Sequence, residues 1–195
     1  MDTARHIVAV ILLVAGLPAI LFWFLIHPFA AFWRRAGARW AYLVAFSAMF
    51  AECWVLYHYR HVLLGDDLGT YWPLVALAAV FEILAILVQR RRKKHLTARI
   101  LVGLPEVDAK QEGGKLLTEG IYGRIRHPRY VEVMLAFIAL ALFANYQYLY
   151  IFLLVAAALI YLLVLIEERE LRERFGEAYV EYSRRVPRFV PRSLR

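Results

Sequence analysis

Five apolar windows along the chain predict membrane-spanning helices. A helix needs about 20 apolar residues to cross the hydrocarbon core of a bilayer, and four of the windows approach this length. The window at 131–144 has 14 residues and would span only about 21 Å at 1.5 Å per residue. It therefore either begins earlier, at Pro128, or crosses incompletely. The windows are Ile7–Ile26, Trp40–Tyr57, Tyr71–Val88, Val131–Ala144 and Tyr148–Ile166.

The boundaries of the last two windows predict how this part of the chain is connected. The break at 145–147 is short enough for a tight turn, so the two helices should form an antiparallel hairpin. Glu170 and Arg174 have the i,i+4 spacing that favours a helix continuing beyond the membrane. Phe175-Gly176 then indicates a stop or kink. The pattern as a whole predicts an all-α integral membrane protein with about five transmembrane helices.

Composition supports this fold class. Hydrophobic residues make up 62% of the chain and the mean hydropathy is +0.54, which is too apolar for an ordinary soluble domain. The single cysteine, Cys53, excludes a disulfide framework and a cysteine-based metal site. Compact length and the lack of a sorting signal suit a prokaryotic inner membrane.

Positive charge is confined almost entirely to alternate loops. The segments 27–39, 89–130 and 167–195 hold 22 of the 24 Lys and Arg residues. Positive-inside bias then places the N-terminus outside and the C-terminus in the cytoplasm. The net charge of +8 belongs to a face beside anionic lipid and requires no nucleic acid. We expect one domain over 1–195, with three helices in 1–88, a cytoplasmic segment at 89–130, the hairpin at 131–166 and a cytoplasmic tail at 167–195.

The most informative polar stretch is "GGKLLTEGIYGRIRHPRY", residues 113–130. Its glycines allow sharp turns and close approach to a ligand. Pro128 suits a first helical turn and disfavours the α conformation at His127. Arg126 and His127 are then held beside a helix N-terminus, which suits a carboxylate. The alternative is interfacial anchoring by arginine and tyrosine. The candidate binding residues here are Gly120, Tyr122, Arg126, His127, Pro128 and Tyr130.

Acidic residues supply the second candidate group. Glu167 and Glu168 lie at the membrane boundary, at the depth expected for His127. They either form structural ion pairs with the cationic loop or bind a cationic or hydroxyl-rich ligand. Acids within membrane helices often line a pocket or relay, although a protonated, hydrogen-bonded acid that joins helices is the alternative. Those within or at the mouth of the helices are Glu52, Glu82 and Glu132.

Two further groups have simpler interpretations. The basic block "QRRRKKH", residues 89–95, is typical of a topogenic anchor at lipid headgroups. His58 and His61 have i,i+3 spacing, which leaves a metal- or haem-carrying membrane protein as a weaker alternative function.

The order of motifs over Lys115–Pro191 resembles one family. "LLTEGIYGRIRHPRY", a hydrophobic hairpin, "EE" and "FGEAYVEYSRRVPRFVP" are similar to the integral-membrane methyltransferases, the isoprenylcysteine carboxyl methyltransferase and phospholipid N-methyltransferase superfamily. The resemblance implies S-adenosylmethionine as methyl donor, bound on the cytoplasmic side between the RHP loop and the C-terminal helix. It also implies a lipidic or membrane-soluble acceptor that arrives through the membrane helices.

Within that resemblance, the candidate residues acquire roles. The loop of Arg126 and His127 suits the donor carboxylate, and the Glu167–Glu168 pair suits its ribose hydroxyls or ammonium. Tyr122 and Tyr130 suit the adenine or the sulfonium. An amine acceptor would need a general base, for which the candidates are Glu132, Glu82 and Glu52.

The chain departs from the family pattern at three places. Glu132 replaces the small residue of an RHPxYxG motif, and Leu163–Ile166 carries no basic residue before the Glu pair. These departures disfavour strict isoprenylcysteine activity and favour the alternative of a non-catalytic lipid-binding or assembly protein on the same scaffold. Residues 99–114 look unlike either branch and are a candidate acceptor site of this chain's own.

Overall fold

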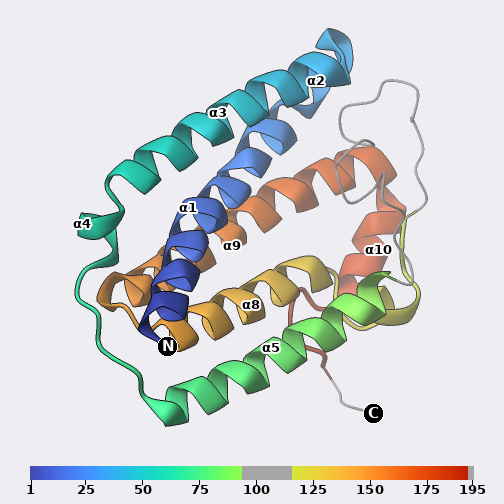
Figure 1. Cartoon of the computed structure of the whole chain (residues 1–195). Helices are drawn as coiled ribbons and strands as arrows, with labels where there is room; N and C mark the ends of the chain where they lie inside the picture. Colours follow the sequence, from blue (N-terminus) through green and yellow to red (C-terminus); the bar gives the residue numbers. More distant parts are fainter. Residues whose placement is uncertain (94–115, 193–195) are drawn as a thin grey trace.

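The computed structural model describes residues 1–93 and 116–192, which are helical apart from their connections and one isolated β-bridge (Figure 1). The proposed acceptor segment 99–114 and the end of the basic block, residues 94 and 95, lie outside the described residues. The elements are α1 (Asp2–Ile26), η1 (His27–Phe29), α2 (Ala30–Ala36), α3 (Ala38–His58), α4 (Arg60–Leu64), α5 (Trp72–Lys93), η2 (Gly120–Gly123), α8 (Pro128–Ala144), α9 (Gln147–Phe175) and α10 (Glu177–Arg185).

Within the described ranges, four helices are long and apolar enough to cross a membrane: Asp2–Ala36, Ala38–His58, Trp72–Lys93 and Gln147–Phe175. The remaining long helix, α8, has 17 residues and begins at Pro128, so the predicted start at Pro128 is confirmed. At 1.5 Å per residue it is about 26 Å long, near the lower limit for a crossing. His127 precedes it with φ −120° and ψ 58°, outside the α region as the proline requires. The predicted all-α membrane fold is confirmed.

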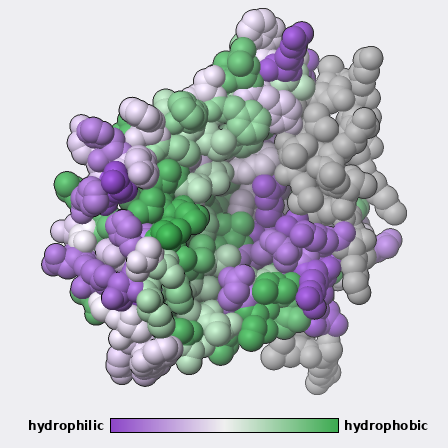
Figure 2. Space-filling model, viewed as in Figure 1, coloured by the Kyte–Doolittle hydropathy of each residue, from purple (hydrophilic) through white to green (hydrophobic). Residues whose placement is uncertain are grey.

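The connections between helices gather at two ends of the molecule (Figure 1). We call the end that carries residues 27–37, 89–93, 116–127 and 176–192 the basic end. The opposite end carries the N-terminus, the α3–α5 connection and the α8–α9 turn, where Gln147 N donates to Asp66 O at 3.0 Å. In Figure 2, hydrophilic residues gather toward both ends and hydrophobic residues lie between them, as a membrane-spanning body requires.

Helix α1 packs against α8 and α9 to form the main core. Gly16 sits at a close contact, because a Cβ there would lie 2.9 Å from Phe152 Cζ. Small residues let membrane helices approach closely. Helix α5 buries one stripe, Ala78, Ala85 and Arg92, with a spacing of seven residues, and packs along α8. The two alanines bring α5 close to α8, and the stripe carries Arg92 inward at the basic end.

Arg5 fastens the opposite end. Its side chain is 1% exposed, and Nε donates to Ala144 O at 3.1 Å while the guanidinium pairs with Asp67 and Asp2. Asn145 takes the left-handed conformation at the predicted tight turn, and its Nδ2 donates to Gly69 O at 2.9 Å. One buried arginine therefore joins the N-terminus, the α3–α5 connection and the hairpin.

At the basic end, the C-terminal segment folds back onto the RHP loop. Helix α9 ends at Phe175 and Gly176 has φ +55°, so the predicted break is confirmed. Helix α10 then packs through Tyr179 and Tyr182. Beyond it, Arg126 N donates to Pro187 O at 2.9 Å and His127 N donates to Arg188 O at 3.0 Å. This return brings the segment after Val186 against the predicted binding loop.

Candidate functional site

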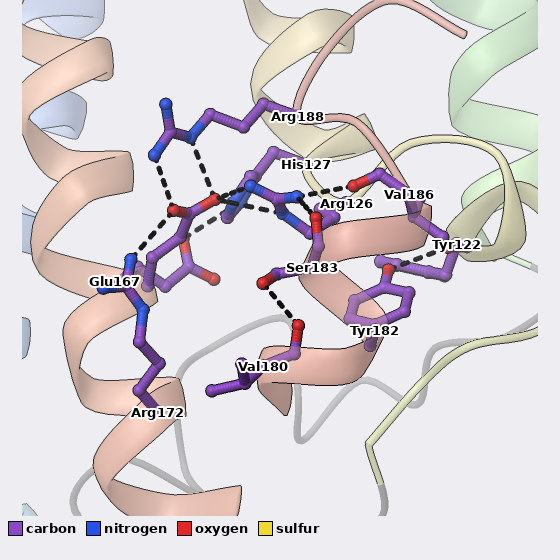
Figure 3. Close-up of polar contacts among 11 residues, drawn as sticks. Tyr122, Arg126, His127, Glu167, Arg172, Val180, Tyr182, Ser183, Val186 and Arg188 are labelled. Carbon is purple, nitrogen blue, oxygen red and sulfur yellow. Dashed lines mark hydrogen bonds and ion pairs between the residues drawn. The ribbon is translucent and has the colours of Figure 1, made fainter. Parts of the chain in front are cut away.

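Glu168 is the centre of the polar network at the basic end, because it binds Arg126, His127, Arg172 and Arg188. Figure 3 shows these four side chains converging. The Glu168 side chain is 1% exposed and accepts hydrogen bonds from three arginines. Arg126 donates through Nε at 3.1 Å and Nη2 at 2.6 Å, and Arg188 through Nε at 3.1 Å and Nη2 at 2.9 Å. Arg172 Nη2 lies at 3.4 Å and His127 Nε2 at 3.2 Å. Glu168 therefore forms ion pairs with the cationic loop, as one of the two alternatives from the sequence predicts.

Arg126 is engaged by the protein at every guanidinium nitrogen. Besides its two bonds to Glu168, its Nη1 donates to Ser183 O at 2.6 Å and to Val186 O at 2.5 Å. These acceptors lie at the end of α10, so Arg126 joins the RHP loop, α9 and α10. The arrangement makes Arg126 a framework cation that holds the site together.

Glu167, one position earlier on α9, is in a different state. Its Oε2 is buried and has no hydrogen-bond partner within the described part of the chain. His127 Nδ1 lies 3.7 Å from it, beyond hydrogen-bond range. A buried acceptor left unsatisfied costs folding free energy, and such groups in native proteins call for an explanation. Glu167 is therefore the acid of the pair that has an unused acceptor oxygen among the described residues.

His127 is buried beside two aromatic side chains. Its side chain is 3% exposed, and its ring centroid lies 5.8 Å from that of Tyr130 and 6.1 Å from that of Phe189. Pro128, which starts α8, is fully buried. The imidazole therefore stands between Glu167 and Glu168 with its position set by aromatic neighbours.

Tyr122 marks a second group of charges beside this network. It lies in η2, which begins at Gly120 with φ +61°, a conformation that glycine adopts readily. Burial raises the pKa of Tyr122 to about 12, and its charged neighbours are Arg92, Glu167, Arg129 and Glu132. The phenol therefore keeps its proton at neutral pH and can donate a hydrogen bond.

Glu132 faces α5 and is held by it. Arg92 Nε donates to Glu132 Oε2 at 2.7 Å, Arg92 Nη2 to Oε1 at 3.2 Å, and Gln89 Nε2 to Oε1 at 3.0 Å. The sequence placed Arg92 in a topogenic block, whereas its side chain is only 6% exposed. The available signal was its position seven residues after Ala85, on the buried stripe of α5.

Arg188, like Arg92, belongs to the site but was not predicted from the sequence as a site residue. Its side chain is 33% exposed, the most accessible of the cations that contact Glu168 apart from Arg172. Hydrogen bonding to Glu168 raises the pKa of Arg188 above its ordinary value. The signal in the sequence is its place between Pro187 and Pro191, where the chain cannot form a regular helix.

An apolar groove of about 320 Å³ adjoins His127. It runs between α8, α9 and the C-terminal segment, and its walls are almost entirely carbon. Tyr130 and Phe189 belong both to this groove and to the surroundings of the His127 ring. The His127 ring thus shares two aromatic neighbours with a surface suited to hydrocarbon. Other lining residues include Met134, Ile138, Ile160 and Tyr161.

The other predicted acids and histidines lie elsewhere. Glu82 is exposed on α5, ten residues and about 15 Å along the axis from Arg92. Glu52 is half-buried on α3, about 9 Å along the axis from the helix end at His58. His61 stacks on His6. Residues 1–93 and 116–192 contain no group of three or more His, Cys, Asp or Glu that could hold a metal ion.

Comparison with known proteins agrees with the motif-based resemblance. A family model described as phospholipid methyltransferase matches residues 104–178, a stretch that contains the RHP loop, the hairpin and the Glu pair. No solved structure matches the chain. The family match confirms the resemblance to the integral-membrane methyltransferase superfamily and supports a membrane methyltransferase as the general class of this protein.

Proposed function

We propose that this protein transfers a methyl group from S-adenosylmethionine to a lipidic or membrane-soluble acceptor at the basic end. The observation that carries the proposal is Glu167. It presents a buried, unpartnered carboxylate oxygen 3.7 Å from His127, where the segments of the family match converge. The donor combines cationic groups with hydroxyls, and both are partners that such an oxygen accepts.

The residues divide into a framework and a binding surface. Arg126, Glu168 and Pro128 fix the loop on α9 and α10. Glu167 is available for the donor's ammonium or ribose hydroxyls. Tyr122 and Tyr130 offer ring faces to the adenine or the sulfonium, and the backbone at Gly120 permits close approach.

S-adenosylmethionine supplies a methyl group activated by its sulfonium charge. The chain's own contribution is to hold donor and acceptor in line and to keep water out. The groove beside His127 suits the hydrocarbon part of the acceptor, because its lining is apolar. Carboxylate or thiolate acceptors need no base, whereas an amine acceptor must lose a proton. Glu132 is the candidate base nearest to Tyr122 and its charged neighbours, and Glu82 and Glu52 are more distant candidates.

The proposal includes an orientation. With the basic end in the cytoplasm and the N-terminus outside, the site faces the compartment that contains the methyl donor. The distribution of Lys and Arg supports this orientation, in a membrane that we take to be a prokaryotic inner membrane.

Calorimetry with S-adenosylhomocysteine on the purified chain in detergent tests the function. We expect saturable binding that Glu167→Ala or His127→Ala weakens by about tenfold or more, as loss of a charged hydrogen bond implies. Arg91→Ala should bind normally, since Arg91 is exposed. Absence of binding at millimolar ligand would refute the proposal. Equal losses of affinity in all three variants would mean that the charges of the basic end matter only for folding.

A second candidate is a lipid-binding or assembly protein that has kept the scaffold without turnover. The ion pair of Glu132 with Arg92 favours it, because both carboxylate oxygens of Glu132 are already engaged by side chains of α5. The apolar stretch Leu163–Ile166 is the other supporting feature. Binding of the donor without methyl transfer to any extracted lipid would identify this alternative.

A further inference from the structure

Two buried atoms of opposite polarity lack partners at the basic end. One is Glu167 Oε2 on α9 and the other is Arg92 Nη1 on α5. The Arg92 side chain is 6% exposed, so water does not readily satisfy its remaining N–H groups. The two atoms do not bond to each other, since neither has a hydrogen-bond partner among the described residues.

Both groups act electrostatically on the same tyrosine. Arg92 and Glu167 are among the charges that shift the pKa of Tyr122, and they do so in opposite directions. They reach it from different helices, and η2 brings Tyr122 against α5. Both groups also meet the start of α8, because Glu167 Oε2 lies 3.7 Å from His127 Nδ1 and Arg92 pairs with Glu132, five residues further along. A cation with one free donor nitrogen and an anion with one free acceptor oxygen therefore lie near one protonated phenol.

The guanidinium of Arg92 is oriented by its existing contacts. Its Nε and Nη2 are bound to Glu132, and Gln89 supports the same carboxylate. Because the guanidinium is planar and rigid, this edge fixes where Nη1 points. Its free N–H groups are thus pre-oriented donors for an oxyanion.

The neighbouring cations are less suited to that role. Arg126 has a protein partner at each nitrogen. Arg188 uses Nε and Nη2 on Glu168, and Arg129 lies 4.4 Å from the centroid of the Trp23 ring. The carboxylate that the sequence assigned to the RHP loop therefore has a better partner in Arg92.

We infer that Arg92 and Glu167 form the two poles of a site for a zwitterion, with an ammonium at Glu167, a carboxylate or phosphate at Arg92 and Tyr122 between them. The inference rests on the proposed function and deepens it. Two ligands share this chemistry: the amino-acid end of the methyl donor, and the headgroup of a zwitterionic phospholipid acceptor.

A pair of nucleosides distinguishes the first source. S-adenosylhomocysteine carries the amino-acid group, and 5′-methylthioadenosine has the same nucleoside thioether without it. If the site holds the donor, Arg92→Gln and Glu167→Gln each weaken binding of S-adenosylhomocysteine by about tenfold, which corresponds to about 1.4 kcal/mol. Binding of 5′-methylthioadenosine stays unchanged in both variants.

The ratio of the two affinities within one variant guards against misfolding, because a smaller folded fraction lowers the titration stoichiometry for both ligands alike. Arg92→Gln leaves Glu132 with the hydrogen bond from Gln89 alone. Arg92→Lys therefore serves as a second variant, which keeps the positive charge and loses the planar set of guanidinium donors. It should weaken the binding of S-adenosylhomocysteine less than Arg92→Gln does. Arg91→Gln, at an exposed position of the same helix, is the matched control with wild-type affinities.

The second source is tested with short-chain diacyl phosphoethanolamine in mixed micelles, compared with phosphatidic acid of the same chains. Loss of the preference for phosphoethanolamine in both variants, with nucleoside affinities unchanged, assigns the site to the acceptor.

Variants that match Arg91→Gln in both titrations would overturn the inference. So would Glu167→Gln weakening both nucleosides equally, since Glu167 would then hold the ribose. Failure of the wild type to bind S-adenosylhomocysteine would instead reject the proposed function on which the inference rests.

Discussion

At the scale of single residues, two adjacent glutamates have divided roles. Glu168 accepts hydrogen bonds from three arginines, whereas Glu167 Oε2 has no partner within the described residues. Replacing Glu168 by Gln leaves those cations clustered around a neutral amide. We expect a loss of about 3 kcal/mol in the free energy of unfolding, measured as a lower melting temperature in detergent.

Glu167→Gln is the matched control for this prediction. The substitution keeps the size of the side chain and removes a charge that has no hydrogen bond at Oε2. Its melting temperature should stay close to that of the wild type, while its ligand binding falls. Equal destabilisation by the two substitutions would contradict the division of roles.

The sequence predicted the meeting of the loop and the Glu pair but not this division. Pro128 fixes the start of α8, and a hairpin of two helices returns the chain to the same depth. Neighbouring positions on a helix point about 100° apart, so the rotation of α9 decides which acid meets Arg126. A buried stripe with a spacing of four residues leads to Glu168 and consists of Phe152, Ala156, Ile160 and Val164. The sequence does not reveal this stripe, because the other positions of the membrane-spanning part of α9 are also apolar.

At the scale of elements, the ends of the helices were predictable where glycine, proline or a polar break marks them. The hairpin turn, the start of α8 and the break at Gly176 are such cases. The inward position of Arg92 was not predicted, because its spacing of seven residues from Ala85 is a weak signal and a charge at the end of a membrane helix can equally reach lipid headgroups. Only the packing of α5 on α8 turns it inward.

Arg5 provides the clearest test at this scale. It joins α1 to the α8 terminus and to the α3–α5 connection through Ala144 and Asp67. Arg5→Ala leaves the Ala144 carbonyl and the Asp67 carboxylate without this partner. We therefore expect a loss of about 2–3 kcal/mol in the free energy of unfolding, measured by thermal melting. Arg35→Ala, at an exposed position of α2, is the control. An Arg5→Ala protein that melts like this control would exclude the proposed fastening.

At the scale of the whole molecule, the two ends use charge differently. The opposite end buries one arginine that joins its connections. The basic end combines a framework network, two buried side chains that each have one unpartnered atom among the described residues, and an apolar groove. Such a combination allows a water-soluble donor and a bilayer-soluble acceptor to meet only if the basic end faces the donor's compartment. The orientation of the chain is therefore a condition of the proposed chemistry.

Cysteine labelling tests this orientation directly. The sole cysteine, Cys53, donates to Val14 O at 3.1 Å, and Cys53→Ser keeps a donor while removing the thiol. In that background, Asp66→Cys reports on the opposite end and Arg185→Cys on the basic end, both at exposed positions. A membrane-impermeant maleimide added to intact cells should label only Asp66→Cys, and permeabilised cells should label both. Labelling of Arg185→Cys alone in intact cells would place the site outside, away from a cytoplasmic methyl donor, and the proposed function would then fail even if the purified chain binds the donor.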